Sequence, residues 1–255
     1  MIRFTNVSKH YGEKVAVNDL NLAVRPGEIF AFLGPNGAGK TTSIKMMIGL
    51  LFPTDGHIEL NGFDVQTNPG DAKRSIGFVP DQPELYDKLT GREFLQFVAD
   101  MHGLSPSDAA DSISEQANNF NITEFYDKLT EDYSHGMKQR VAFAAALIHD
   151  PAVVILDEPM VGLDPKSMRL VKDLLKRRAT RGKTVFMSTH TLTVAEEIAD
   201  RIGVINHGEL LFLGTCEELK THLELNNQSS ENASLEDLFL TLTNMENPIS
   251  EEATH

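Results

Sequence analysis

The pattern of apolar and polar positions divides the chain into short strands and helices. Unbroken apolar runs such as "VVIL" and "TVFM" are typical of strands in a parallel sheet, where helices cover both faces. The apolar strand "EIFAFLG" leads into a glycine-rich loop and then into "KTTSIKMMIGLL", which we expect to be a helix that ends at Pro53. Strand patterns on both sides of turn residues predict hairpins in "GHIELNGFDV" and "RIGVINHGELLFLG".

The order of these segments predicts the fold class. Residues 1–32 have the pattern of short strands joined by turns, and residues from about 86 to 150 have a mainly helical pattern. Strands and helices then alternate, and a hairpin follows that ends at Gly214. Because buried apolar strands that alternate with helices are typical of parallel sheets, we predict an α/β fold with a helical insertion.

The part of the chain after Gly214 has a different character. A short helix is predicted in "CEELKTHLEL", a linker in "NNQSSENAS" and a further helical pattern in "LEDLFLTLT". Residues 216–255 contain nine Asp and Glu against one Lys, so they carry −8 of the formal net charge of −14. We therefore divide the chain into a domain over residues 1–214 and an acidic extension over residues 215–255, whose last residues we expect to be disordered.

Composition and charge argue against several classes of protein. The 255 residues include a single cysteine, so no disulfide can form within the chain. No apolar run approaches the ~20 residues of a membrane-spanning helix, so we expect no direct membrane insertion. The net charge of −14 argues against binding to nucleic acid or to an anionic membrane surface, since both depend on clustered Lys and Arg. If the protein acts at a membrane, we expect another protein to hold it there.

A glycine-rich loop, "GPNGAGKTT", matches the phosphate-binding pattern G-x-x-x-x-G-K-[ST] and lies between an apolar strand and a helix. Glycines allow backbone N–H groups to point at phosphates, and the start of the following helix adds its positive end. We expect Lys40 to reach the terminal phosphates, the Thr41 hydroxyl to ligate Mg²⁺, and Thr42 to give a further phosphate contact. The predicted binding loop consists of Gly34, Pro35, Asn36, Gly37, Ala38, Gly39, Lys40, Thr41 and Thr42.

Two carboxylates, Asp157 and Glu158, follow the apolar run "VVIL". Ligands of parallel sheets bind at the carboxyl ends of the strands, so we expect both side chains near the phosphate-binding loop. Asp157 has the chemistry of a Mg²⁺ partner, directly or through water, and Glu158 that of the base that takes a proton from the attacking water. Adjacent carboxylates are common in loops, and it is the complete phosphate-binding loop that favours the catalytic interpretation.

His190 and Tyr11 are further candidates. His190 ends the strand that follows the one with Asp157, so it is a candidate contact of the γ-phosphate, although a lone histidine is more often structural or simply exposed. Tyr11 lies 23 residues before Gly34 and is a candidate for stacking on adenine. A core or surface tyrosine explains that position equally well.

A second small polar loop, "YSHGM", opens directly onto the helical run "KQRVAFAAALIHD", which is the layout of a second phosphate-binding site. Tyr11, "GPNGAGKTT", "YSHGM", "VVILDE", "GLDP" and "STH" follow one another in the order found in the ATP-binding subunits of ABC transporters. From about Ile2 to Gly214 the chain resembles that family. The resemblance implies a P-loop NTPase core with a mainly parallel sheet, an N-terminal antiparallel β subdomain and an inserted helical subdomain at about residues 86–150.

The resemblance also implies a function for the second loop. "YSHGM" is similar to the family's signature loop, usually LSGGQ, which binds the γ-phosphate of ATP held by the opposite subunit. Ser134 would supply its hydroxyl and Gly136 a backbone N–H, and an N-cap role of Ser134 for the helix is compatible with this. The other three residues of "YSHGM" depart from LSGGQ. Asp164 in "GLDP" would lie across the same interface between subunits.

The family places a glutamine after the strand "SIGFVP", where it contacts Mg²⁺ and the attacking water. Alignment on Leu85 and Tyr86 puts Asp81 at that position, with Gln82 one residue later. We predict that Gln82 serves as the catalytic residue and metal ligand. Asp81 stays open as the alternative.

The resemblance predicts an ATPase, with ATP and Mg²⁺ as cofactors, that powers transport through a separate integral membrane permease. It implies a second ATP-binding subunit, in the simplest case a homodimer, and a cytoplasmic location on the inner face of the membrane. Because "YSHGM" and "SLEDLFLTLT" resemble exporter subunits, export is the predicted direction. Two alternatives stay open: a soluble ABC-type ATPase, such as a cluster-assembly ATPase, and a nucleotide-binding regulator without hydrolysis. The intact Lys40, Asp157, Glu158 and His190 argue against the regulator.

Overall fold

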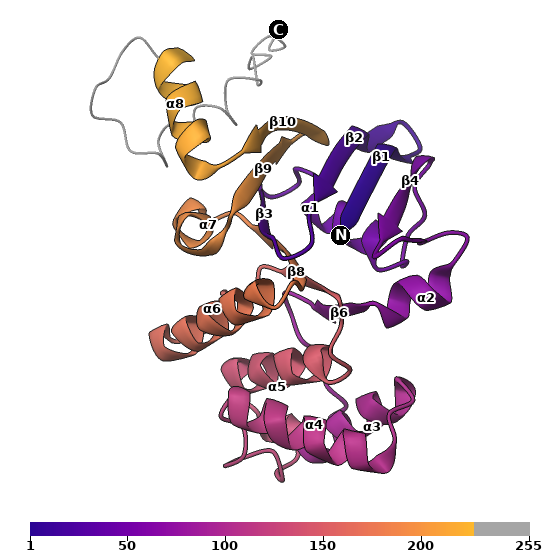
Figure 1. Ribbon diagram of the computed structural model, residues 1–255, viewed down its shortest axis with the longest axis vertical. Coiled ribbons are helices and arrows are strands. Elements are labelled where there is room, and N and C mark those ends of the chain that lie inside the picture. The colour runs from indigo at the N-terminus through magenta and orange to yellow at the C-terminus, as the bar shows by residue number, and fades with distance from the viewer. Residues whose placement is uncertain (227–255) are drawn as a thin grey trace, which may run out of the picture.

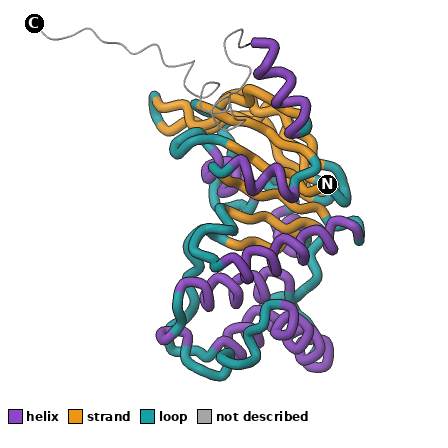
Figure 2. Tube along the Cα trace, turned by 90° about the vertical axis from the view of Figure 1, so that its left-hand side faces the viewer, coloured by secondary structure: helices purple, strands orange, loops and turns teal. Residues whose placement is uncertain are grey.

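Two β-sheets and a lobe of helices make up the described part of the chain. The computed structural model describes residues 1–226. Figure 1 shows the strands in the upper part of the molecule and a group of helices below them, and Figure 2 shows the same division after a quarter turn. The predicted α/β fold with a helical insertion is therefore confirmed.

The smaller sheet is antiparallel and comes from the start of the chain. Its strands lie in the order β2-β1-β4-β5. β4 and β5 pair as the hairpin predicted for "GHIELNGFDV". The four strands are β1 (Ile2–Tyr11), β2 (Lys14–Val24), β4 (Asp55–Leu60) and β5 (Phe63–Asp64).

The larger sheet carries the ends of the strands that matter for function. Its order is β10-β9-β3-β8-β7-β6, and it is parallel from β9 to β6, with β10 antiparallel to β9. Every residue of β3, β7 and β8 is buried, which explains the apolar runs in their sequences. The strands are β3 (Ile29–Leu33), β6 (Ile76–Val79), β7 (Val153–Asp157), β8 (Thr184–Thr189), β9 (Arg201–Asn206) and β10 (Glu209–Gly214).

The register of this sheet aligns three strand ends at one edge. Leu33 of β3 pairs with Thr189 of β8, and Asp157 of β7 pairs with Ser188 of β8. The segments that follow β3, β7 and β8 consequently start side by side, as expected at the carboxyl edge of a parallel sheet.

The helices cover this sheet and form the separate lobe. α3, α4 and α5 lie together at the lower end of Figure 1, where the stacked rings of Phe120 and Phe143 are 5.5 Å apart. The lobe and the large sheet share one apolar core, and a second core lies between the two sheets and α1. The helices are α1 (Lys40–Met47), α2 (Pro69–Arg74), α3 (Gly91–Met101), α4 (Pro106–Asn119), α5 (His135–Leu147), α6 (Pro165–Thr180), α7 (Leu192–Ile198), α8 (Cys216–Asn226) and a 3₁₀ turn (Thr130–Asp132).

Two helices differ from the sequence-based expectation. α1 ends at Met47 and not at Pro53, because the chain turns at Gly49, which has a φ of +70°. Glycine adopts this left-handed conformation without strain and commonly terminates helices. α2 occupies a stretch in which no element was predicted, although Pro69 near its start is a known helix-start signal.

The predicted helix after Gly214 is present as α8, and its residue Leu219 is fully buried in the larger core. The predicted linker from residue 227 onward, the helical pattern in "LEDLFLTLT" and the disordered end lie outside the described residues. Of the helices described, none combines the length and the apolar character that crossing a membrane requires.

Candidate active site

The loop between β3 and α1 has a backbone that only glycine accommodates at two positions. Gly39 has a φ of +112°, and a Cβ there would lie 2.7 Å from the carbonyl oxygen of Ala16. A Cβ at Gly34 would lie 2.3 Å from the carbonyl oxygen of Ile205. No side chain among the described residues caps the start of α1 at Gly39, so its first N–H groups are available to a phosphate.

Lys40 folds back over this loop. Its Nζ donates hydrogen bonds to the carbonyl oxygens of Gly34 at 2.6 Å and Pro35 at 3.2 Å, and lies 3.7 Å from Glu158 Oε1. Burial lowers the pKa of Lys40, and the negative charges of Glu158 and Asp157 oppose part of that shift. A buried ammonium group with this many oxygen neighbours is well placed to receive phosphate oxygens.

Asp157 ends β7 and lies next to the start of α1. Its Oδ2 accepts a hydrogen bond from the Thr41 hydroxyl at 3.4 Å, and its Oδ1 accepts one from the Ser188 hydroxyl at 2.5 Å. Burial raises the pKa of Asp157, as do the nearby charges of Glu158 and Asp81, whereas the hydrogen bonds from Ser188 and Thr41 lower it. Paired carboxylate and hydroxyl oxygens at a site crowded with negative charge fit a divalent cation such as Mg²⁺.

Glu158 lies between the side chains of Lys40 and His190. Its Oε1 is 3.0 Å from His190 Nδ1 and 3.7 Å from Lys40 Nζ. The Glu158 side chain is 14% exposed and that of His190 is 53% exposed, so the carboxylate is enclosed while the imidazole faces solvent. The predicted group of Lys40, Asp157, Glu158 and His190 therefore meets at the carboxyl edge of the large sheet.

A cavity of about 920 Å³ opens over these residues. Residues 35–42 of the phosphate-binding loop, Asp157 and Glu158 line it, as does Tyr11, which is 46% exposed. Of the predicted residues here, Gly34 and His190 are not among the described residues that line it. Sequence reasoning missed several lining residues, namely Lys14, Val15, Ala16, Asn206 and His207. The only local signal was the "NHG" turn, whose Gly208 N–H donates to the Ala38 carbonyl at 2.9 Å.

Asp81 lines both the large cavity and a smaller neighbouring one, whereas Gln82 lines only the smaller one. Asp81 is half-buried and lines the large cavity beside Asp157. Gln82 is exposed and lines a neighbouring cavity of about 440 Å³, together with Tyr133 and His135 of the second loop. For Gln82 to reach the large cavity, the loop after β6 has to move, whereas Asp81 is already there.

The second loop lies elsewhere on the surface. Ser134 is the N-cap of α5 and accepts a hydrogen bond from the Met137 N–H at 3.3 Å. Among the described residues, the lining of the large cavity includes neither Ser134 nor Gly136. Asp164 is the N-cap of α6, where the hydrogen bond from the Ser167 hydroxyl lowers its pKa.

His135 connects these two loops within one chain. Its Nε2 lies 3.4 Å from the carbonyl oxygen of Val161, and its ring occupies the space where a Cβ of Gly162 would be. The loop with Ser134 and the loop with Asp164 are therefore neighbours, as the proposed common interface requires.

Residues 17–161, more than half of the chain, match the family model described as "ABC transporter". The chain belongs to this family. The linearmycin resistance ATP-binding protein LnrL of Bacillus subtilis is 37% identical over 223 residues, which are 88% of this chain and 72% of the relative.

Two solved structures are similar to the fold. The ATP-binding subunit of an ABC transporter has a TM-score of 0.87 at 30% identity, covering 95% of this chain and 99% of its own. A dimeric ATP-binding cassette in a post-hydrolysis state with ADP and Pi has a TM-score of 0.75 at 28% identity, covering 84% and 98%. The predicted family and fold are confirmed: the chain is an ATP-binding, ATP-hydrolysing subunit of an ABC transporter.

Proposed function

We propose that two copies of this chain bind two ATP molecules at a shared interface and drive export through a separate membrane permease. The observation that carries the proposal is the placement of Glu158 in the cavity beside Lys40, with His190 3.0 Å from its carboxylate, while Ser134 and Gly136 are not among the described residues that line the cavity. A complete site then requires the Ser134 loop of a second copy. The similar dimeric cassette with ADP and Pi supports this arrangement.

Nucleotide binding rests on the phosphate-binding loop. The backbone N–H groups of Gly37 and Gly39 and the start of α1 surround the phosphates. Lys40 exchanges its present carbonyl contacts with Gly34 and Pro35 for phosphate oxygens, and Thr42 adds a hydroxyl contact. Tyr11 lies at the exposed side of the cavity, where its ring can stack on the base.

Thr41 and Asp157 are the residues that would hold Mg²⁺. When bound, the ion would supply positive charge that offsets the negative charge of the phosphates. The Thr41 hydroxyl oxygen and Asp157 Oδ2 lie 3.4 Å apart, and burial raises the pKa of Asp157, so a cation at this place would stabilise the charged carboxylate.

Hydrolysis requires a base next to the γ-phosphate, and Glu158 fits this function. Its carboxylate accepts the proton of the attacking water. His190 holds the carboxylate through Nδ1 and presents the rest of its exposed ring to the phosphate. Gln82, or Asp81 from its place in the cavity, orients the water and completes the metal site.

The interface couples the two nucleotides. Ser134 and Gly136 of one copy contact the γ-phosphate held by the other, and Asp164 lies in the same interface. Because ATP binds the closed pair more tightly than the separate copies, nucleotide and closure stabilise each other. Hydrolysis of ATP removes this stabilisation, so the pair opens.

The permease contact is proposed on the helical lobe. A cavity of about 380 Å³ lies there, lined by apolar residues of α3 and α5. Tyr86 and Met101, at 58% and 72% exposure, add apolar surface in the same region. Through this contact the permease holds the protein at the inner face of the membrane.

A relative named for linearmycin resistance supports export, since resistance by transport requires removal of the compound.

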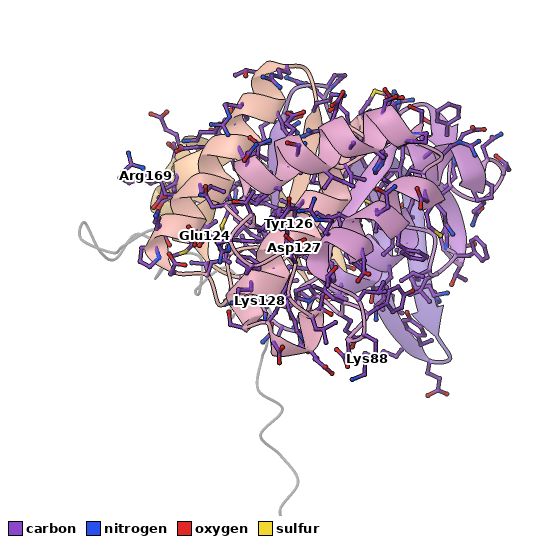
Figure 3. The ribbon with its side chains drawn as sticks, turned by 90° about the horizontal axis from the view of Figure 1, so that it is seen from below. Lys88, Glu124, Tyr126, Asp127, Lys128 and Arg169 are labelled. Atoms are coloured by element: carbon purple, nitrogen blue, oxygen red, sulfur yellow. The ribbon has the colours of Figure 1, made fainter. Side chains whose placement is uncertain are left out.

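The substitution Glu158→Gln tests the catalytic assignment. We expect unchanged ATP binding but hydrolysis at least about 100-fold slower, because general-base catalysis contributes about 10²–10⁴-fold. ATP turnover and ATP affinity are measured on the same preparation. The matched control is Glu124→Gln, an exposed residue at the end of the helical lobe (Figure 3), which should change neither quantity. Wild-type turnover in Glu158→Gln would remove Glu158 from its role.

A further inference from the structure

Ser188 is a fully buried polar residue in β8 and the first residue of "STH", a motif in which only His190 was assigned a function. It is 0% exposed and pairs directly with Asp157 across the parallel strands β7 and β8. Paired residues of neighbouring parallel strands have their side chains on the same face of the sheet, which explains why the two side chains meet. A buried hydroxyl at this place needs hydrogen-bond partners, and both of its partners belong to the catalytic site.

The Ser188 hydroxyl makes two hydrogen bonds, one as donor and one as acceptor. It donates to Asp157 Oδ1 at 2.5 Å and accepts from the backbone N–H of Glu158 at 3.1 Å. A serine hydroxyl has one proton to donate and lone pairs that accept, so both bonds form at the same time. One oxygen atom thus connects the side chain of the metal-ligand candidate to the backbone of the candidate base.

Glu158 has a backbone that needs such support. Its φ is +46°, a left-handed conformation that is strained for any residue other than glycine. Besides the Ser188 hydroxyl, the Glu158 N–H is 3.2 Å from the Ser188 carbonyl oxygen. In this conformation the Glu158 carboxylate reaches Lys40 and His190.

We propose that Ser188 is a positioning residue for ATP hydrolysis, which fixes the Asp157 carboxylate at Thr41 and the Glu158 backbone in its left-handed conformation. The hydrogen bonds of its hydroxyl go to Asp157 and to the Glu158 backbone. Ser188 affects hydrolysis through Asp157 and Glu158. Its hydroxyl oxygen, which is bonded to both residues, sets their positions relative to each other. The inference rests on the proposed function, since it takes Glu158 as the base.

The proposal is tested by substitutions that separate the effect of the Ser188 hydroxyl group from the effect of side-chain shape. Ser188→Ala removes the hydroxyl without adding volume. Ser188→Thr keeps the hydroxyl, and Ser188→Val has the same shape as threonine without it, so the last two form a matched pair. The readouts are kcat, KM for ATP, the Mg²⁺ concentration at half-maximal rate, and Tm.

We expect kcat to fall about 10- to 100-fold in Ser188→Ala and Ser188→Val, the usual effect of losing a hydrogen-bonded supporting residue. Because the phosphate-binding loop is untouched, ATP affinity without turnover should stay within about threefold. The Mg²⁺ requirement should rise in the same two variants, as Asp157 loses its fixed orientation. Ser188→Thr should recover most of the kcat that Ser188→Val loses.

Two results would overturn the inference. The first is wild-type kcat in Ser188→Ala. The second is equal loss in Ser188→Thr and Ser188→Val, which would show that only packing matters. Glu158→Gln, measured in parallel, distinguishes the two claims. If Glu158→Gln is inactive while Ser188→Ala is fully active, the Ser188 inference alone fails. If Glu158→Gln is active, the assignment of the base fails and the inference fails with it.

Discussion

At the scale of single residues, His135 and Gly162 are matched in size across two neighbouring loops. Gly162 has a φ of +74°, and a Cβ at this position would lie 2.4 Å from Cδ2 of the His135 ring. The usual signature loop of the family has glycine where this chain has His135. The histidine therefore uses space that only a glycine at position 162 leaves free, and it ties the Ser134 loop to the Asp164 loop.

We expect Gly162→Ala to push the His135 ring away from Val161 and to lower ATPase activity. The matched control is Gly182→Ala, because Gly182 has a φ of +81° with no described atom within 4 Å of a Cβ. Both changes carry the backbone cost of about 1–3 kcal/mol, but only the first displaces a side chain. Urea unfolding and ATPase rates of Gly162→Ala, His135→Gly and the double variant measure the coupling. Additive effects would show that the ring and the glycine do not interact.

The residues of the phosphate-binding loop were predictable because their chemistry is local. The pattern from Gly34 to Thr42 encodes backbone conformation, helix start and lysine within one short stretch. Asn206 and His207 were not predictable as lining residues, because their place depends on the order of strands in the sheet. Nothing in the sequence shows that β9 lies beside β3, or that Ser188 pairs with Asp157.

At the scale of elements, two histidines join the lobe helices to the large sheet. His102, the C-cap of α3, stacks on His149 after α5, with ring centroids 3.6 Å apart and an angle of 9°. His149 Nε2 lies 2.9 Å from the carbonyl oxygen of Ile76, the first residue of β6. Burial, with the positive charges of His102 and Arg178, lowers the pKa of His149 to about 4, while the Ile76 contact and Asp150 oppose the shift.

This stack predicts a loss of stability in acid. A folded-state pKa of about 4, below the ordinary 6.5, means that the unfolded chain binds the proton more readily. The contribution of His149 is thus fully present above pH 6.5 and is lost as pH falls toward 4. Burial also lowers the pKa of His102, which acts in the same direction. Tm measured from pH 7.5 to 4.5 should fall less steeply in His149→Gln than in wild type, whereas His10→Gln, at an exposed position, should match wild type. Parallel curves for His149→Gln and wild type would contradict this.

The type and order of the elements were predictable, and their ends were less so. β3, β7 and β8 were visible as apolar runs because both of their faces are buried, and the polar residues of β7 and β8 lie only at the strand ends. The end of α1 was misplaced, because Pro53 is a stronger signal in the sequence than Gly49, while in the structure Gly49 turns the chain first. α2 is too short for apolar periodicity to reveal it.

At the scale of the whole molecule, the two loops that we propose to contact phosphate lie apart within one chain. The phosphate-binding loop and Glu158 lie at the edge of the large sheet, and the Ser134 loop begins the lobe helix α5 (Figure 1). Their separation within one chain is the reason for proposing a dimer, since the Ser134 loop has the chemistry of an anion site but no part in its own chain's cavity.

The mass of the Glu158→Gln protein in solution, with and without ATP, tests this claim most directly. Slow hydrolysis should trap the closed pair, so light scattering with saturating ATP should give twice the 28.2 kDa of one chain. Adding Ser134→Arg in the same background should return the mass to that of a monomer without weakening ATP binding to it. Ser114→Arg, at an exposed position of α4, should leave the dimer intact. A protein that stays monomeric with ATP bound, or a dimer indifferent to Ser134→Arg, would contradict the account.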